Sequence, residues 1–338
     1  MRETAGGGPE ELLERHRREL TAYCYRMLGS PFEAEDAVQE TFLRAWRGLA
    51  GLEQPAALRT WLYRIATNVC LDLLRGRDRR ALPVDLGPPG TAADPLGDPL
   101  PEEAWVRPVP DPLVVPEDAD PAQVVEIRES VRLAFVAALQ RLPPRQRAVL
   151  ILREVLGWRA AEVADLLGTS VAAVNSALQR ARATLDATGD PRGEPRPIGD
   201  VERELLERYV DAFERYDLDA LTSLLHRDAA WTMPPYRLWL RTHEDVRRWC
   251  LGPGIGCLGS RLVPTRANGA PAFGHYKPGD RPGILEPWSL QVLELSGGRI
   301  AGIAFHLDTE ALFPLFGLPA QLEARRPPIA PRGSPNGA

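Results

Sequence analysis

The chain has 338 residues, of which 44% are hydrophobic and 26% charged, and its formal net charge is −5 at pH 7. These values are typical of a folded globular protein of two or three domains and exclude a wholly disordered chain. No stretch reaches the ~20 apolar residues that span a bilayer, and the N-terminus lacks the apolar core of a signal peptide, so we expect a cytoplasmic protein without membrane contact. The four cysteines form no zinc-binding pattern, so we expect free thiols, no metal and no cofactor. These cysteines are Cys24, Cys70, Cys250 and Cys257.

Residues 8–80 show helical periodicity. Apolar residues recur at three- and four-residue steps from Leu12 to Leu28 and stop at the sequence GSP, which predicts a first helix. A second helix follows Ser30, and a third runs through LRTWLYRIATNVCLDLLR into an arginine-rich segment. The apolar face of the second helix is predicted to comprise Val38, Phe42, Leu43 and Trp46. The pattern alone is also that of a generic three-helix bundle with solvated arginines.

Residues 81–121 carry nine acidic residues and one basic residue among frequent prolines and glycines. Such a composition cannot bury enough apolar surface to offset its ordering entropy, so we expect an extended acidic linker. Trp105 and Val106 are the exceptions and are expected to dock locally. Residues 187–199 are predicted to form a second linker, and residues 326–338 a disordered tail.

Residues 122–186 predict four helices, at about 122–141, 144–156, 159–167 and 170–185. Gly168 supplies the left-handed residue of a tight turn, and Ser170 or Thr169 can cap the last helix. The outline is that of a helix-turn-helix, whose second helix normally enters the DNA major groove, although helix–glycine–helix also occurs in plain bundles. The sequence SVAAVNSALQRAR of that helix contains only two charges, Arg180 and Arg182, which is sparse for a DNA reader.

Residues 200–325 begin with a helical segment and then change to the two-residue period of strands. Asn268-Gly269 and Gly297-Gly298 lie between predicted strands and indicate hairpin turns. Helices followed by a run of strands predict an α+β domain with helices packed on a curved antiparallel sheet. The predicted fold is therefore multidomain, with two all-α domains and one α+β domain.

In this order the segments resemble a known family. EAEDAVQETFLRAWRGL followed by LRTWLYRIATNVCLDLLR is similar to region 2 of sigma-70 family RNA polymerase sigma factors of the extracytoplasmic-function type. LQRLPPRQRAVLILREVLGWRAAEVADLLGTSVAAVNSALQRAR is similar to region 4. The C-terminal motifs MPPYRLWLRTHEDV, ANGAPAFGHY and FPLFGLP resemble the cone-shaped SnoaL-like fold of the nuclear transport factor 2 superfamily.

This resemblance implies core RNA polymerase and promoter DNA as partners. The resemblance assigns Asp36, Gln39, Glu40 and Arg44 to the surface of this chain that meets the β′ clamp helices of the polymerase. It also implies the β subunit as a partner. Phe42 and Trp46 are expected to pack inward instead. The acidic linker is expected either to thread near the nucleic-acid path of the polymerase or to act as a plain tether.

The resemblance also assigns two DNA-reading surfaces. The −10 surface comprises Tyr63, Arg64, Asn68, Arg75, Arg77, Arg79 and Arg80. Asn68 matches a position that contacts an unstacked base, and the arginines suit phosphate contacts. Trp61 and Tyr63 are candidates to stack on such a base, although core packing is the favoured interpretation for Trp61. The −35 surface comprises Ser170, Asn175, Ser176, Gln179, Arg180 and Arg182. Its low charge is tolerable in a subunit that core polymerase delivers to DNA, because phosphate neutralisation supplies most nonspecific affinity.

The C-terminal domain is expected to contain an apolar pocket. The candidate lining residues are Trp231, Trp239, His275, Tyr276, Trp288, His306 and Asp308. A histidine near an aspartate can serve acid–base chemistry, but the fold does not fix the function, and we expect no enzymatic activity. The sequence leaves four alternatives open. The domain regulates a sigma factor intramolecularly, or it senses an unidentified small molecule. Alternatively, it is a ligand-binding or catalytic domain tethered to a helix-turn-helix regulator, or the protein is a polymerase-independent repressor.

Overall fold

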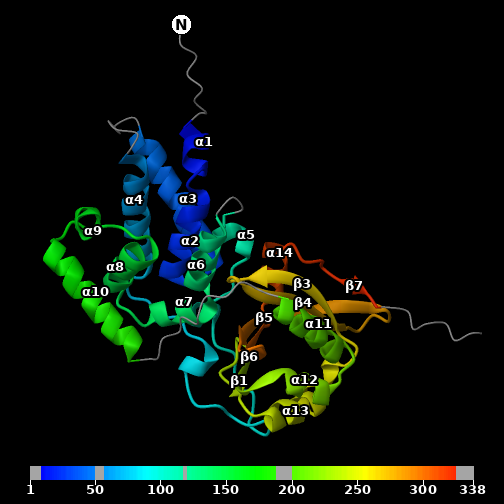
Figure 1. The fold of residues 1–338 in the computed structure, drawn as a ribbon. Coiled ribbons are helices and arrows are strands. Elements are labelled where there is room, and N and C mark those ends of the chain that lie inside the picture. The colour runs from blue at the N-terminus through cyan, green and yellow to red at the C-terminus, as the bar shows by residue number, and fades with distance from the viewer. Residues whose placement is uncertain (1–8, 50–56, 117–119, 188–199, 325–338) are drawn as a thin grey trace, which may run out of the picture.

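The computed structural model of the chain describes residues 9–49, 57–116, 120–187 and 200–324 (Figure 1). Blue helices of the N-terminal part stand beside the green helices of the middle part, and the yellow-to-red C-terminal domain lies below the blue helices and to the right of α8 and α10. The predicted tail 326–338 and nearly all of the predicted linker 187–199 fall outside the described residues. None of the described helices is both long and apolar enough to cross a membrane.

The N-terminal part is helical, as predicted. Its helices are α1 (Pro9–Glu14), α2 (Arg17–Leu28), α3 (Pro31–Gly48) and α4 (Leu58–Leu73). Gly29 ends α2 with a left-handed φ of 73°, and Pro31 opens α3 at a position where a proline's missing N–H costs nothing. Buried residues from α2, α3 and α4 form the centre of this bundle.

The middle part contains the predicted helix-turn-helix. Its elements are α6 (Pro121–Val131), α7 (Leu133–Gln140), α8 (Pro144–Leu150), a π-helical turn (Ile151–Val155), α9 (Ala160–Leu167) and α10 (Val171–Asp186). Gly168 adopts the left-handed conformation, and the Ser170 hydroxyl accepts a hydrogen bond from the Ala173 N–H at 3.1 Å, which caps α10. The single helix predicted over 122–141 is wrong, because Arg132 adopts an extended backbone with ψ of 141°.

The C-terminal part is the predicted α+β domain. It comprises α11 (Asp200–Glu214), α12 (Leu218–Leu224), β1 (Leu225–Thr232), β2 (Trp239–Leu240), α13 (His243–Leu251), β3 (Arg261–Ala267), β4 (Ala270–Pro278), β5 (Ile284–Ser296), β6 (Arg299–His306), α14 (Thr309–Leu315) and β7 (Leu322–Glu323). The sheet order is β2-β1-β6-β5-β4-β3, with β7 added to β5. All pairs are antiparallel except β1–β6, which is parallel. The two hairpin turns lie where they were predicted.

Helices α11, α12 and α13 cover the sheet and enclose the domain core, which contains Tyr209, Phe213, Trp231, Phe273 and Phe305. A second core runs through α2–α4 and α7–α10 and includes Ala267 and Ala272, which lie beside the turn of the β3–β4 hairpin. The C-terminal domain is therefore packed onto the helical parts rather than tethered beside them.

The linker prediction is wrong for residues 81–116. This segment contains two short 3₁₀ turns, at Pro83–Asp85 and Glu102–Ala104, and the helical turn α5 (Asp111–Val114). Trp105 and Val106 are buried, as expected, but so is Val109. These buried apolar side chains, together with hydrogen bonds to both neighbouring domains, hold the segment in place, although its composition predicted that it would be solvated.

Candidate functional site

The exposed face of α3 carries the predicted polymerase-binding residues. Asp36, Gln39 and Arg44 are exposed, and Arg44 forms an ion pair with Glu40 at 2.7 Å. The inward packing expected for Trp46 is wrong, because its side chain is 56% exposed. The helix presents this indole beside its charged residues.

Leu43 was also expected on the apolar face of α3 but is 55% exposed. Large apolar side chains in solvent commonly mark an interaction surface. The spacing of three residues places Leu43 and Trp46 on one face of the helix but does not show whether that face is buried or exposed.

Tyr63 on α4 is buried in this conformation, where its ring is not accessible to a DNA base, and its expected stacking role stays a prediction. Its ring is buried between Tyr23, at a centroid distance of 5.1 Å, and Trp158 of the middle part, also at 5.1 Å. Its hydroxyl donates to Glu19 at 3.2 Å. Trp158 therefore covers the face of α4 that was expected to read the −10 element.

Beside this contact, α9 lies against α4. Arg64 forms an ion pair with Asp165 at 2.8 Å, and the Arg59 guanidinium lies 5.6 Å from the ring centroid of Trp158. Asn68 is exposed. The structure thus brings the helix assigned to −10 recognition into contact with the first helix of the helix-turn-helix.

The arginines after α4 divide into two groups. Arg75, Arg77 and Arg79 are exposed, and of these Arg75 pairs with Asp72 at 2.9 Å. Arg77 and the buried Arg80 both pair with Glu33, at 2.5 Å and 2.8 Å. Arg80 is buried and is not accessible to a phosphate in this arrangement, so its expected phosphate contact stays a prediction.

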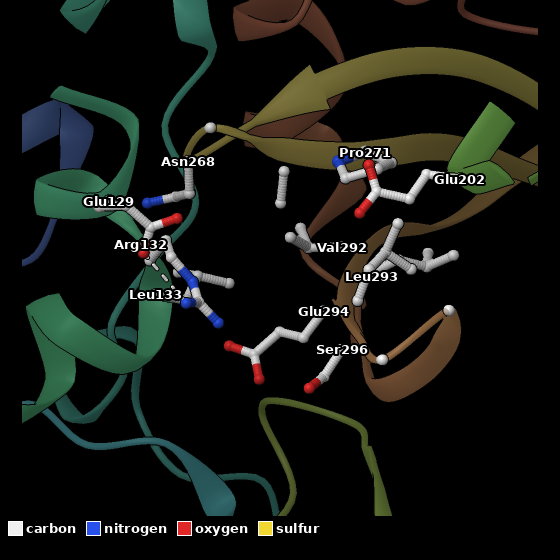
Figure 2. Close-up of a pocket in the computed structure, with 15 residues that line it drawn as sticks. Glu129, Arg132, Leu133, Glu202, Asn268, Pro271, Val292, Leu293, Glu294 and Ser296 are labelled. Atoms are coloured by element: carbon white, nitrogen blue, oxygen red, sulfur yellow. Dashed lines mark hydrogen bonds and ion pairs between the residues drawn. The ribbon is translucent and has the colours of Figure 1, made fainter. Parts of the chain in front are cut away.

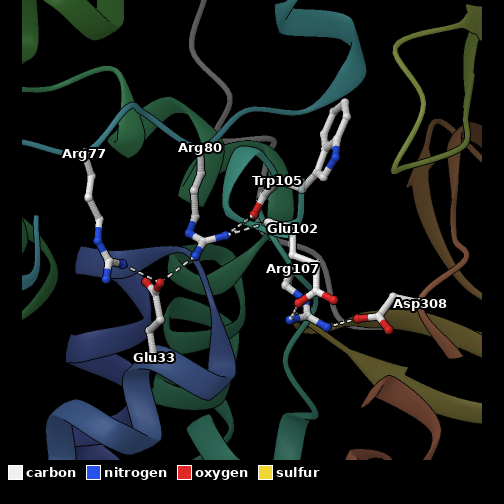
Figure 3. A network of polar contacts seen from close by, with 7 residues as sticks. All are labelled: Glu33, Arg77, Arg80, Glu102, Trp105, Arg107 and Asp308. Carbon is white, nitrogen blue, oxygen red and sulfur yellow. Dashed lines mark hydrogen bonds and ion pairs between the residues drawn. The ribbon is translucent and has the colours of Figure 1, made fainter. Parts of the chain in front are cut away.

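Arg80 belongs to a polar network that crosses three parts of the chain (Figure 3). It donates to the carbonyl oxygens of Trp105 and Glu102 at 2.8 and 2.9 Å. Arg107 in turn pairs with Glu102 at 2.9 Å and with Asp308 of the C-terminal domain. The network ties α3 to the linker and the linker to the C-terminal domain.

On α10, the residues assigned to the −35 element lie on one accessible face. Asn175, Gln179 and Arg180 are exposed, and Arg180 donates to the half-buried Ser176 at 2.6 Å. Arg182 is paired with Glu154 rather than left available for a phosphate. Ser170 acts as the helix cap described above.

The turn of the β3–β4 hairpin inserts between the helical parts. Asn268 is fully buried, and its Nδ2 donates to the Tyr25 hydroxyl at 2.7 Å and to the Val131 carbonyl at 2.6 Å. Its Oδ1 accepts from the Val109 N–H at 2.9 Å. The break between α6 and α7 leaves the Val131 carbonyl available for this contact. One side chain therefore joins α2, the linker, the α6–α7 junction and the C-terminal sheet.

Asp111 secures the same turn from the linker. Its carboxylate accepts from the Gly269 N–H at 2.7 Å and from Arg266 Nε at 2.9 Å. A Cβ on Gly269 would lie 2.6 Å from Arg128 of α6, and φ here is 73°, so only glycine fits. The Asn-Gly pair predicted as a hairpin turn is thus also an interdomain contact.

Next to the hairpin, a cleft of about 430 Å³ separates α6 and α7 from β5 (Figure 2). Arg132, paired with Glu129 at 3.1 Å, faces it from the helices, and Glu294 faces it from the sheet. Burial raises the pKa of the Glu294 carboxyl above its ordinary value.

The pocket residues predicted in the C-terminal domain do not form one site. Trp231, His275 and Trp288 line one cavity. His306 and Asp308 line a second cavity, against the linker. Trp239 and Tyr276 are used in packing: Trp239 donates to the Gly87 carbonyl at 3.0 Å, and Tyr276 donates to the Pro319 carbonyl at 2.7 Å.

His275 is bound on both ring nitrogens. Nδ1 lies 3.1 Å from the Ser289 hydroxyl, and Nε2 lies 2.9 Å from the Ser260 hydroxyl. Because both nitrogens are occupied, this histidine offers no free nitrogen for acid–base chemistry.

We expect the C-terminal domain to lose stability in mild acid. Burial lowers the pKa of both His275 and His306 to about 3, whereas an unfolded histidine titrates near 6.5. Acid therefore protonates the unfolded state first, and stability present above about pH 6.5 falls progressively toward pH 3, by about 2 kcal/mol per histidine at pH 5. Calorimetric unfolding between pH 7 and 5 measures this slope, and a His275→Gln/His306→Gln chain should show a shallower one. An equal slope in both proteins would contradict the assignment.

Two protein-family models match this chain, one over each of its two helical parts. The model of Sigma-70 region 2 matches residues 12–80, and that of Sigma-70, region 4 matches residues 132–185. The ECF RNA polymerase sigma factor SigG of Mycobacterium tuberculosis is 49% identical over 319 residues, covering 91% of this chain and 83% of that protein. SigJ of the same organism is 33% identical over 246 residues, 70% of each chain. The crystal structure of SigJ aligns with a TM-score of 0.59 at 25% identity, covering 92% of this chain and 99% of that one.

Proposed function

Since the chain belongs to the extracytoplasmic-function (ECF) RNA polymerase sigma factors, we propose that its C-terminal domain holds sigma regions 2 and 4 in a closed arrangement and thereby regulates transcription initiation. As a sigma factor, the protein binds core RNA polymerase and promoter DNA. The alternative of a helix-turn-helix regulator that works without polymerase leaves the region 2 match over residues 12–80 without a role.

The observation that carries this proposal is the contact between α4 and α9. The −10 and −35 elements are centred roughly 25 base pairs apart, or about 85 Å at ~3.4 Å per base pair. Arg64 of region 2 lies 2.8 Å from Asp165 of region 4. Two regions in direct contact cannot occupy both promoter elements, so the closed arrangement must open before initiation.

The C-terminal domain supplies the bonds that keep the arrangement closed. Asn268 bonds at once to α2 of region 2 and to the Val131 carbonyl beside region 4. Asp308 holds the linker between the two regions through Arg107. Opening must break these contacts, so the domain lowers the population of the open form.

Run-off transcription tests the proposal. A chain ending at Ala187 should give more transcript with core polymerase than the full chain, because the closing contacts are gone. Far-UV circular dichroism and core-polymerase binding verify that the shortened chain is folded. Equal transcript from equally bound full and shortened chains would refute intramolecular regulation.

Small-molecule sensing is a second candidate function. It is favoured by the cavity that Trp231, His275 and Trp288 line, because Leu96 of the linker forms part of its wall. A molecule bound there would contact the segment that connects the two sigma regions.

A further inference from the structure

The cavity of the C-terminal domain is small and mainly apolar, with several aromatic rings in its wall. Its volume is about 180 Å³. Its lining combines aromatic and aliphatic side chains, and Trp231 and Phe305, whose ring centroids lie 4.5 Å apart, form part of its wall together with Phe213 and Trp249. A dry apolar cavity of ~150 Å³ is large enough to bind benzene, so this one suits a single ring with a small substituent.

One cationic side chain enters this apolar lining. Lys277, the sole lysine among 41 basic residues, lines the cavity with its ammonium 3.2 Å from the ring centroid of Trp288. No aspartate or glutamate is among the lining residues of the described chain, and Lys277 forms no ion pair there, since Glu286, opposite it on β5, pairs with Arg281 at 3.7 Å. His275 is neutral and bound to two serines, so it offers no competing charge.

We propose that the cavity binds a small aromatic carboxylic acid, with the ring in the apolar lining and the carboxylate paired with Lys277. A partly buried cation without a carboxylate partner gains most from an anion, because the surrounding low dielectric strengthens their attraction. The aromatic lining selects the remainder of the molecule. This inference deepens the proposed sensing function and rests on it.

The contact between the linker and the cavity determines whether a ligand favours the closed or the open form. Leu96 of the linker lines the cavity. Two hydrogen bonds fix the linker on either side of it. The Gly90 N–H donates to the Trp239 carbonyl and the Leu100 N–H donates to the Pro235 carbonyl, both at 2.9 Å. The cavity exists with Leu96 in place, so a ligand fills it without displacing the linker. The added contacts to Leu96 are present only in the closed form, and the ligand therefore stabilises that form.

Titration calorimetry of the full chain with benzoate tests the ligand class, and benzamide serves as the uncharged probe of the same shape. Benzoate should bind at least ten-fold tighter than benzamide. The Lys277→Met chain should lose this preference, whereas Arg281→Met, which removes an exposed arginine that does not line the cavity, should keep it. Equal affinity for both probes, or no benzoate binding at millimolar concentration, would overturn the proposal.

Hydrogen exchange tests the coupling to the linker. Benzoate should slow exchange of the Gly90 and Leu100 amides in the wild-type chain at least three-fold, and the effect should be smaller in Leu96→Ala. Unchanged exchange at saturating benzoate would overturn the coupling. The transcription comparison with the shortened chain contains no ligand, so failure of the ligand proposal and failure of intramolecular regulation give different results.

Discussion

Replacing Asn268 with alanine should open the closed arrangement while leaving each domain folded. The substitution removes three hydrogen bonds that link the hairpin to Tyr25, Val109 and Val131. The Val109 N–H and the Val131 carbonyl would remain buried without these partners, at about 1–3 kcal/mol each. Alanine at a φ of 56° adds strain of about 1 kcal/mol. A total of about 3–7 kcal/mol is a substantial fraction of the ~5–15 kcal/mol by which folded proteins are stable, and this loss falls on contacts between domains rather than on the core of one.

Small-angle X-ray scattering and run-off transcription measure the opening. The radius of gyration should increase, and transcript from the full chain should rise several-fold toward that of the shortened chain. Gly298→Ala is the matched control, because Gly298 has a φ of 72° at the tip of the other hairpin, where an added Cβ meets nothing within 4 Å. This control has similar backbone strain without an interdomain contact. If both variants had the same scattering and activity, strain rather than the lost hydrogen bonds would be responsible.

The Asn268 turn also shows how far sequence reasoning reaches. Asn-Gly between two alternating segments predicted the hairpin, because both residues tolerate positive φ. Nothing local predicted its insertion, since the side-chain partners Tyr25, Val109 and Val131 lie 243, 159 and 137 residues away. The signal for the turn was local, whereas its role in joining domains depends on the tertiary fold.

The arginines after α4 illustrate a second limit. Arg75, Arg77, Arg79 and Arg80 are equivalent by composition, and all four suit phosphate contacts. The structure separates them through one carboxylate, Glu33, which lies 44 residues before Arg77 in the sequence. Sequence spacing cannot show which arginine is withdrawn into such a network.

The linker shows why composition alone misled. Its proline and acidic content predicted an unburied tether, but the buried Trp105, Val106 and Val109 and the ion pairs of Arg107 anchor it. The sequence did single out the first two as local exceptions. The sequence does not show the surface that these residues pack against, because region 2 and the C-terminal domain form that surface together.

Replacing Trp158 with alanine should uncover the face of α4 that region 4 now hides. Trp158 is buried, its ring packs on Tyr63, and the Arg59 guanidinium lies over the same ring. Large-to-small substitution at such a site costs about 3–5 kcal/mol. The neighbouring Arg64–Asp165 pair is 43% and 76% exposed, and exposed pairs contribute only about 0–1 kcal/mol, so the indole contributes more than this pair to the contact between α4 and region 4.

Hydrogen exchange distinguishes loss of this contact from unfolding of region 4. In Trp158→Ala, the amides of α4 should exchange faster while those of α10 remain protected, because α10 keeps its own buried residues Val174, Leu178 and Ala181. Trp158→Phe retains a ring against Tyr63 and should lie between the wild type and the alanine variant. If protection were lost throughout α8–α10 with α4 unchanged, Trp158 would serve only the fold of region 4. Faster exchange confined to α4, together with increased transcript from the full chain, would identify this indole as the cover of the −10 surface.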